Sequence, residues 1–142
     1  MQELGQYFTK NESLQRKVFE LIRNGPRTIL EPSMGRGDLV RYVLSQDNGI
    51  KFDMYEIDQT IQLLPEIDTT NLTYGDFLKQ EIETKYQTII GNPPYVKTKK
   101  GNLYIDFIYK CFQLLDADGE LIFIVPSDFF KLTSAIAIIN DM

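Results

Sequence analysis

The residues best suited to chemistry in this sequence are 92–95, an asparagine, two prolines and a tyrosine in a row. Proline has no N–H and cannot continue a central strand, so the strand predicted over 86–91, with Ile89 and Ile90 at its buried end, stops here. The side-chain oxygen of Asn92 and the main-chain carbonyl of Pro93 are both acceptors, and together they can hold an –NH2 group. The ring of Tyr95 offers a flat face for stacking on a planar base. A plain proline turn with a surface tyrosine is the alternative for such a motif taken alone.

A second candidate site follows the short apolar strand expected at residues 28–30. A glycine turn comes next, and a helix is expected over residues 39–44. Glycines at such a turn let the backbone take positive φ and let a ligand approach closely. Val40 stands where the dinucleotide-binding fingerprint has its third glycine, which argues against a pyrophosphate, and the acidic Glu31 suits an ammonium group. A plain glycine turn is the alternative here. The candidate residues of this turn are Glu31, Ser33, Gly35 and Gly37.

Two further predicted strands end in acidic residues. The strand expected over residues 50–57 delivers Glu56, which is 56 − 37 = 19 positions beyond Gly37. A carboxylate about 20 residues after the glycine turn is placed to accept both hydroxyls of a ribose. The short strand 72–74 leads to Asp76 and Phe77. The Asp76 carboxylate can accept from an adenine amine, and the Phe77 ring can pack on the adenine ring. Equally, Asp76 can be a helix N-cap and Phe77 a core residue.

The elements alternate between strand and helix along the chain. This alternation predicts an α/β fold with a doubly wound, mainly parallel sheet, in which ligands bind at the carboxyl ends of the strands. After the last strand we expect a helix to begin and the chain to stop without a further strand. The other predicted elements are helices at 12–23, 59–64 and 103–115 and a strand at 120–125.

Composition limits the possible functions. The 142 residues, 43% hydrophobic and 25% charged, suit one soluble globular domain. The net charge of −5 and the isoelectric point of about 4.7 have the wrong sign for a domain that grips nucleic acid mainly through phosphates. The sequence has no histidine, which excludes histidine as a general base, and no cluster with zinc-ligand spacing.

Location and redox chemistry are constrained in the same way. No apolar run approaches the roughly 20 residues that span a bilayer, and the N-terminus lacks an apolar signal core, so a cytoplasmic location is expected. The one cysteine, Cys111, lies in an apolar helical stretch. We expect a buried, inert thiol there rather than a nucleophile.

In this order, the motifs resemble those of the gamma-class adenine-specific DNA methyltransferases of restriction-modification systems. The resemblance covers nearly the whole chain and rests on residues 6–9, 31–37, 56, 76–77 and 92–95. It implies a Rossmann-like methyltransferase fold, S-adenosylmethionine as cofactor and DNA as partner. It also implies that a flipped-out adenine is methylated on its N6 amine, held by the Asn-Pro-Pro-Tyr motif.

The resemblance assigns roles residue by residue. Its catalytic positions are Asn92, Pro93 and Tyr95. Its cofactor-binding positions are Tyr7, Thr9, Glu31, Ser33, Gly35, Gly37, Glu56, Ile57, Asp76, Phe77 and Asn92.

The sequence departs from the family in two respects. The family's sheet continues in an antiparallel hairpin, and a separate domain recognises the DNA; neither is present in this sequence. We therefore expect a catalytic core without its recognition domain, with an exposed sheet edge that favours self-association.

Other substrates and a non-catalytic role remain open. Asn-Pro-Pro-Tyr also occurs in methyltransferases that act on the glutamine amide of release factors or on guanine amines of ribosomal RNA. The segment at residues 6–9 favours DNA adenine. A different class of function is a non-catalytic one, in which a methyltransferase-like core only binds the cofactor or a partner chain.

Overall fold

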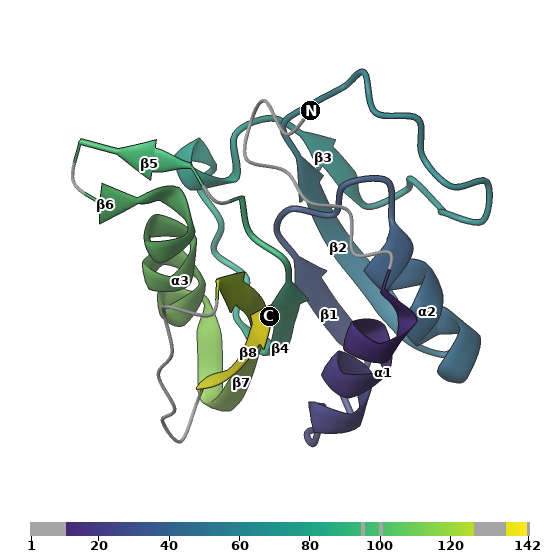
Figure 1. Ribbon diagram of the computed structural model, residues 1–142. Helices are drawn as coiled ribbons and strands as arrows, with labels where there is room; N and C mark the ends of the chain where they lie inside the picture. The colour runs from purple at the N-terminus through teal and green to yellow at the C-terminus, as the bar shows by residue number, and fades with distance from the viewer. Residues whose placement is uncertain (1–10, 95, 100, 127–135, 142) are drawn as a thin grey trace.

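The computed structural model describes residues 11–94, 96–99, 101–126 and 136–141. In this part of the chain a six-stranded sheet has the order β3-β2-β1-β4-β7-β8, and every neighbouring pair is parallel (Figure 1). Strands β5 and β6 form a separate antiparallel hairpin. The strands of the main sheet are β1 (Thr28–Glu31), β2 (Lys51–Glu56), β3 (Leu72–Tyr74), β4 (Tyr86–Gly91), β7 (Leu115–Pro126) and β8 (Ile136–Asp141). The remaining elements are α1 (Glu12–Leu21), α2 (Asp38–Gln46), the 3-10 helix η1 (Phe77–Lys79), β5 (Lys97–Thr98), β6 (Gly101–Asn102) and α3 (Leu103–Gln113).

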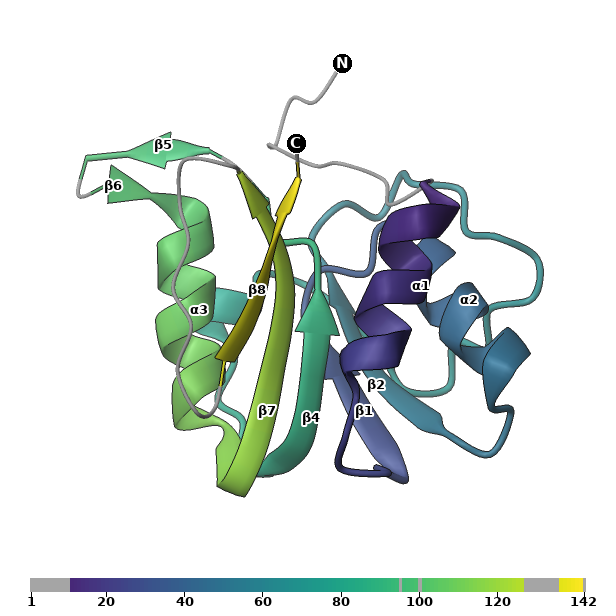
Figure 2. The same ribbon diagram turned by 60° about the horizontal axis from the view of Figure 1, so that its bottom comes forward.

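The helices cover both faces of the sheet. Figure 2 shows α1 and α2 on one side of the strands and α3 on the other. Side chains alternate along each strand, so Ile90 of β4 packs with α1 and α2 while its neighbour Ile89 packs with α3. The two apolar clusters confirm the doubly wound, mainly parallel fold predicted from the sequence.

The predicted helix over residues 59–64 is wrong. These residues form turns and irregular chain between β2 and β3. Asp58 Oδ1 accepts from both the backbone N–H and the hydroxyl of Thr60, at 2.9 and 2.6 Å. Such side-chain bonds offer the backbone an alternative to helix, and the proline at 65 disfavours helical backbone just before it.

The end of the chain also differs from the prediction. A further strand exists: β8 lies parallel to β7, with Leu121 opposite Ile136. The exposed sheet edge from which we predicted self-association was that of β7, and in the structure β8 pairs with this edge. Strand β7 also begins at Leu115 rather than at 120, and residues 116–119 form an irregularity inside it, with Asp118 at φ 62°.

The single cysteine behaves as expected. Cys111 of α3 is fully buried, and this burial raises the pKa of its thiol well above the ordinary value. Such a thiol stays protonated and unreactive at neutral pH. No helix in the described part of the chain is long and apolar enough to cross a membrane.

Glu120 fastens the connection between α1 and β1 to the sheet. Its carboxylate accepts from the backbone N–H groups of Arg23 and Asn24, each at 3.0 Å. The hydroxyl of Thr88, which is fully buried in β4, donates to the same carboxylate at 2.7 Å. Removing the acceptor leaves a buried hydroxyl unsatisfied, which is more costly than losing an exposed bond.

We expect Glu120→Ala to lower the free energy of unfolding by about 1–3 kcal/mol, because Thr88 loses its partner. Urea unfolding followed by circular dichroism measures this. Glu83→Ala is the control, since Glu83 is exposed, and its effect should stay within about 0.5 kcal/mol. Equal unfolding midpoints for the two variants would show that the Glu120 clamp does not stabilise the fold.

Candidate cofactor and catalytic site

The ends of β1, β2 and β4 meet at one edge of the sheet, and backbone contacts join their loops. The Ser33 hydroxyl donates to the main-chain carbonyl of Asn92 at 3.2 Å. The N–H of Gly35 donates to the carboxylate of Glu56 at 2.8 Å. The glycine turn therefore touches both the Asn-Pro-Pro segment and the acidic end of β2, as the strand-end argument predicted.

The glycine turn has the backbone conformation expected of it. Gly35 and Gly37 have φ of 61° and 100°, values that side-chain-bearing residues rarely adopt. Gly37 is also crowded, because a Cβ there would lie 2.5 Å from Cδ1 of Ile67. The N–H of Leu64 donates to the carbonyl of Arg36 at 2.9 Å. The irregular connection between β2 and β3 thus supports the turn, a role that the sequence analysis missed.

Glu31 lies at the base of this turn and is 2% exposed. Its Oε1 accepts from the N–H of Ser33 at 2.9 Å. A Cβ on Gly91 would lie 2.9 Å from the same oxygen, so a side chain at that position of β4 would force the Glu31 carboxyl group to shift. Burial raises the pKa of the Glu31 carboxyl to about 8; the Ser33 N–H opposes this rise, and the charge of Glu56 adds to it.

Glu56 is the second buried carboxylate of the site, and it is 3% exposed. Burial raises its pKa, while the N–H groups of Asp58 and Gly35, at 3.0 and 2.8 Å, oppose the rise. Ile57, the next residue, is 50% exposed. A buried acceptor beside an exposed apolar side chain is an arrangement that suits a sugar joined to a planar ring.

Asp76 and Phe77 adopt the structural alternative that their sequence left open. Asp76 Oδ1 accepts from the N–H of Leu78 at 3.0 Å and caps η1. The Phe77 ring is 2% exposed, with Tyr55 at its edge and Phe107 stacked on it, both at 5.3 Å between centroids. In this arrangement no face of the Phe77 ring is open to a ligand, and the second oxygen of Asp76 is the group able to accept from one.

The catalytic segment borders the glycine turn. Asn92 is 8% exposed and Pro93 is buried, so both stay close to the sheet after β4 ends. Three predicted site residues, Tyr7, Thr9 and Tyr95, lie outside the described residues. The structure therefore joins the β1, β2 and β4 parts of the predicted site.

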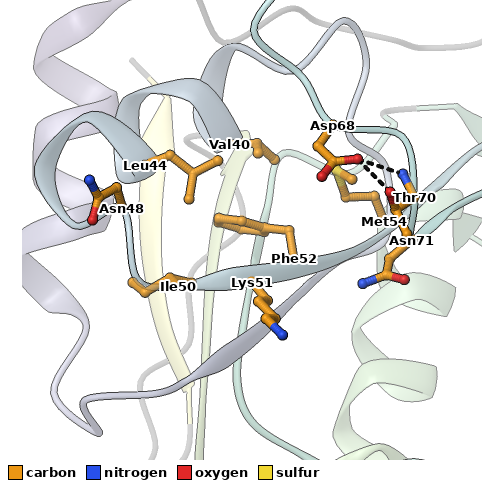
Figure 3. Close-up of a pocket in the computed structure, with 10 residues that line it drawn as sticks. All are labelled: Val40, Leu44, Asn48, Ile50, Lys51, Phe52, Met54, Asp68, Thr70 and Asn71. Atoms are coloured by element: carbon orange, nitrogen blue, oxygen red, sulfur yellow. Dashed lines mark hydrogen bonds between the residues drawn. The ribbon is translucent and has the colours of Figure 1, made fainter.

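A separate cavity of about 370 Å³ lies beside α2 and the first half of β2 (Figure 3). None of the predicted site residues that the structure describes lines it. Apolar side chains such as Leu44 and Phe52 form its wall together with polar groups such as Asn48 and Asp68. It lies away from the carboxyl end of β2, where a parallel sheet binds ligands, so we do not assign it to the site.

A solved structure supports the class of fold. The chain matches a candidate class I S-adenosylmethionine-dependent methyltransferase of Listeria monocytogenes with a TM-score of 0.70 and 15% identity. The match covers 92% of this chain and 50% of the other. The fold is therefore that of the Rossmann-like methyltransferases.

The comparison with protein families is more specific. The family described as Eco57I restriction-modification methylase matches residues 9–140. The modification methylase CviBIII of Paramecium bursaria Chlorella virus NC1A is 34% identical over 87% of this chain and 38% of its own length. The ribosomal RNA small subunit methyltransferase A of Mycoplasma genitalium is 32% identical over 66% of this chain and 39% of its own.

The chain belongs to the Eco57I restriction-modification methylase family. It spans between about a quarter and two fifths of the length of the curated modification methylases it matches. The resemblance inferred from the motifs is confirmed at the level of this family.

The buried carboxyl of Glu31 should make stability depend on pH. In the unfolded chain it ionises near 4.5, and in the folded chain near 8. Between these values the folded state holds a proton that the unfolded state has lost, so stability falls as pH rises. From pH 5 to pH 8 we expect the free energy of unfolding to fall on the order of a few kcal/mol more in the unmodified protein than in Glu31→Gln.

Urea unfolding at pH 5, 6, 7 and 8 checks this. Glu83→Gln removes an exposed carboxylate and should follow the unmodified protein at every pH. Parallel pH profiles for Glu31→Gln and the unmodified protein would contradict the buried, protonated state of Glu31.

Proposed function

We propose that this chain is the core of a DNA methyltransferase that transfers a methyl group from S-adenosylmethionine to the N6 amine of adenine. The observation that carries the proposal is the contact between the Ser33 hydroxyl and the Asn92 carbonyl. It brings the glycine turn, which suits the cofactor, next to the segment that suits the acceptor amine. Family membership agrees with methyl transfer.

The residues at the glycine turn and the strand ends suit S-adenosylmethionine. Glu31 and Glu56 are buried carboxylates with raised pKa values, so a ligand that brings a positive charge or hydroxyl donors would stabilise their ionised forms. Glu31 holds the ammonium group, and Glu56 accepts from the ribose hydroxyls. Gly35 and Gly37 let the ligand approach the backbone, and Ser33 fixes the turn. Ile57 and Asp76 flank the adenine of the cofactor, and Phe77 supports Asp76 from the core.

Asn92 and Pro93 act on the acceptor. Bound at this site, S-adenosylmethionine supplies a methyl group on a sulfonium, which is already a good electrophile. The Asn92 side-chain oxygen and the Pro93 carbonyl accept from the amine and favour it as it becomes tetrahedral and positive. Rigid alignment of this amine with the methyl group supplies much of the remaining acceleration. No strong base is required, in agreement with the absence of histidine from the sequence.

The remaining roles come from the resemblance. Tyr95 stacks on the extruded base, since a base inside a duplex must leave the stack before it can react. Tyr7 and Thr9 close over the methionine end of the cofactor. A recognition domain outside this sequence would contact the DNA site, because a chain of net charge −5 is poorly suited to hold phosphates alone.

One observation favours a second substrate. The match to a ribosomal RNA methyltransferase reaches 32% identity over 102 residues, so ribosomal RNA is the alternative acceptor. Both acceptors present an amine on a flat base, and the chemistry proposed for Asn92 serves either.

We expect Asn92→Ala to abolish methyl transfer and to leave the affinity for S-adenosylmethionine within about threefold, because Asn92, although the resemblance also counts it among the cofactor-binding positions, acts chiefly on the acceptor. Transfer of a labelled methyl group to unmethylated DNA, ribosomal RNA and release factor measures the first effect. Calorimetric titration with S-adenosylmethionine measures the second.

Glu56→Ala is the matched contrast, because it removes a carboxylate assigned to the cofactor. It should weaken S-adenosylmethionine at least tenfold. Equal loss of binding and transfer in Asn92→Ala would contradict these separate roles of Asn92 and Glu56. If the labelled methyl group enters only ribosomal RNA, then ribosomal RNA and not DNA is the acceptor.

A further inference from the structure

Lys110 is a cation within the apolar helix α3, and its ammonium group points at the connection after β3. Its Nζ donates to the carbonyls of Phe77 and Gln80, each at 2.5 Å. The same atom lies 4.9 Å from the centroid of the Phe77 ring. Two carbonyls and one aromatic face thus surround a single positive charge.

These contacts add to the internal bonds of a short turn, such as that from the N–H of Lys79 to the carbonyl of Asp76 at 2.9 Å. Helix η1 spans only Phe77–Lys79, so few of its carbonyls find partners inside it. The N–H of Gln80 donates to the carbonyl of Phe77 at 3.2 Å, near the long limit for such a bond. A cation is favourable at the carboxyl end of a helix, where carbonyls gather, and Lys110 occupies that place.

The position of Lys110 is not that of a solvated lysine. Loss of hydration lowers its pKa, while the charge of Asp76 opposes that change. A lysine on the outer face of α3 would avoid this loss of hydration. The carbonyls and the ring compensate for it, and in doing so they tie α3 to the residues directly after Asp76.

We propose that Lys110 is a positioning residue for the adenine end of the cofactor site. By holding the carbonyls of Phe77 and Gln80 it fixes the turn that Asp76 caps, and hence the direction of the free Asp76 carboxylate oxygen. Lys110 itself touches no ligand. This inference rests on the proposed function of the site, in which Asp76 accepts from the adenine amine.

Lys110→Met tests the proposal, because methionine keeps an unbranched apolar stem and removes the ammonium group. Lys85→Met is the matched control: Lys85 Nζ also donates to a main-chain carbonyl, that of Gln113 in α3 at 2.6 Å, rather than to the carbonyls of Phe77 and Gln80. Titration calorimetry with S-adenosylmethionine and with adenosine gives the affinities. We expect Lys110→Met to weaken both ligands about tenfold and Lys85→Met to change neither by more than about twofold.

Two readouts separate positioning from general destabilisation. Amide hydrogen exchange without ligand should become faster at Leu78, Lys79 and Gln80 in Lys110→Met, while the amides of β4 keep their protection. Lys110→Arg, which keeps the charge and can still reach a carbonyl, should recover most of the affinity for adenosine.

The outcomes distinguish this inference from the proposed function. Tight binding by the unmodified protein and by Lys110→Met alike overturns the role of Lys110 and leaves the proposed function intact. Equal weakening in Lys110→Met and Lys85→Met also overturns it. Failure of the unmodified protein to bind S-adenosylmethionine overturns both.

Discussion

The arrangement of the site depends on one buried carboxyl group, that of Glu31. It is 2% exposed, it accepts from the N–H of Ser33 at 2.9 Å, and burial raises its pKa to about 8. An ionised carboxylate in such surroundings is costly unless a positive partner joins it. The proposed ligand brings that partner as an ammonium group. The free protein instead holds a proton at Glu31.

The neighbouring backbone is shaped around this group. Gly91 leaves room for the Glu31 carboxyl group, since a Cβ there would lie 2.9 Å from its Oε1 and would force it to shift. Gly91 directly precedes Asn92, so this close contact between β4 and Glu31 lies at the start of the Asn-Pro-Pro segment. The Ser33 hydroxyl then binds the Asn92 carbonyl. Donor and acceptor sides of the proposed reaction are thus joined within two adjacent parallel strands.

Much of the fold and part of the site could be predicted from sequence, because strands of a parallel sheet end at one edge. This rule alone predicted that Glu31, Glu56 and Asn92 lie near one another. Local sequence patterns gave wrong predictions where contacts with distant parts of the chain determine the backbone conformation. The 59–64 segment has helical spacing, yet the Leu64 N–H bonds to Arg36 of the glycine turn instead. The role of Lys110 was equally hidden, although a lone lysine in the apolar run 103–115 was a signal.

We infer that Glu31 exchanges its proton for a cationic group of the cofactor. Calorimetric binding of S-adenosylmethionine at pH 7, measured in two buffers with different ionisation enthalpies, counts the protons released. We expect release of close to one proton per ligand bound in the unmodified protein, and release close to zero in Glu31→Gln. Binding of the cofactor to the unmodified protein without proton release would contradict the account.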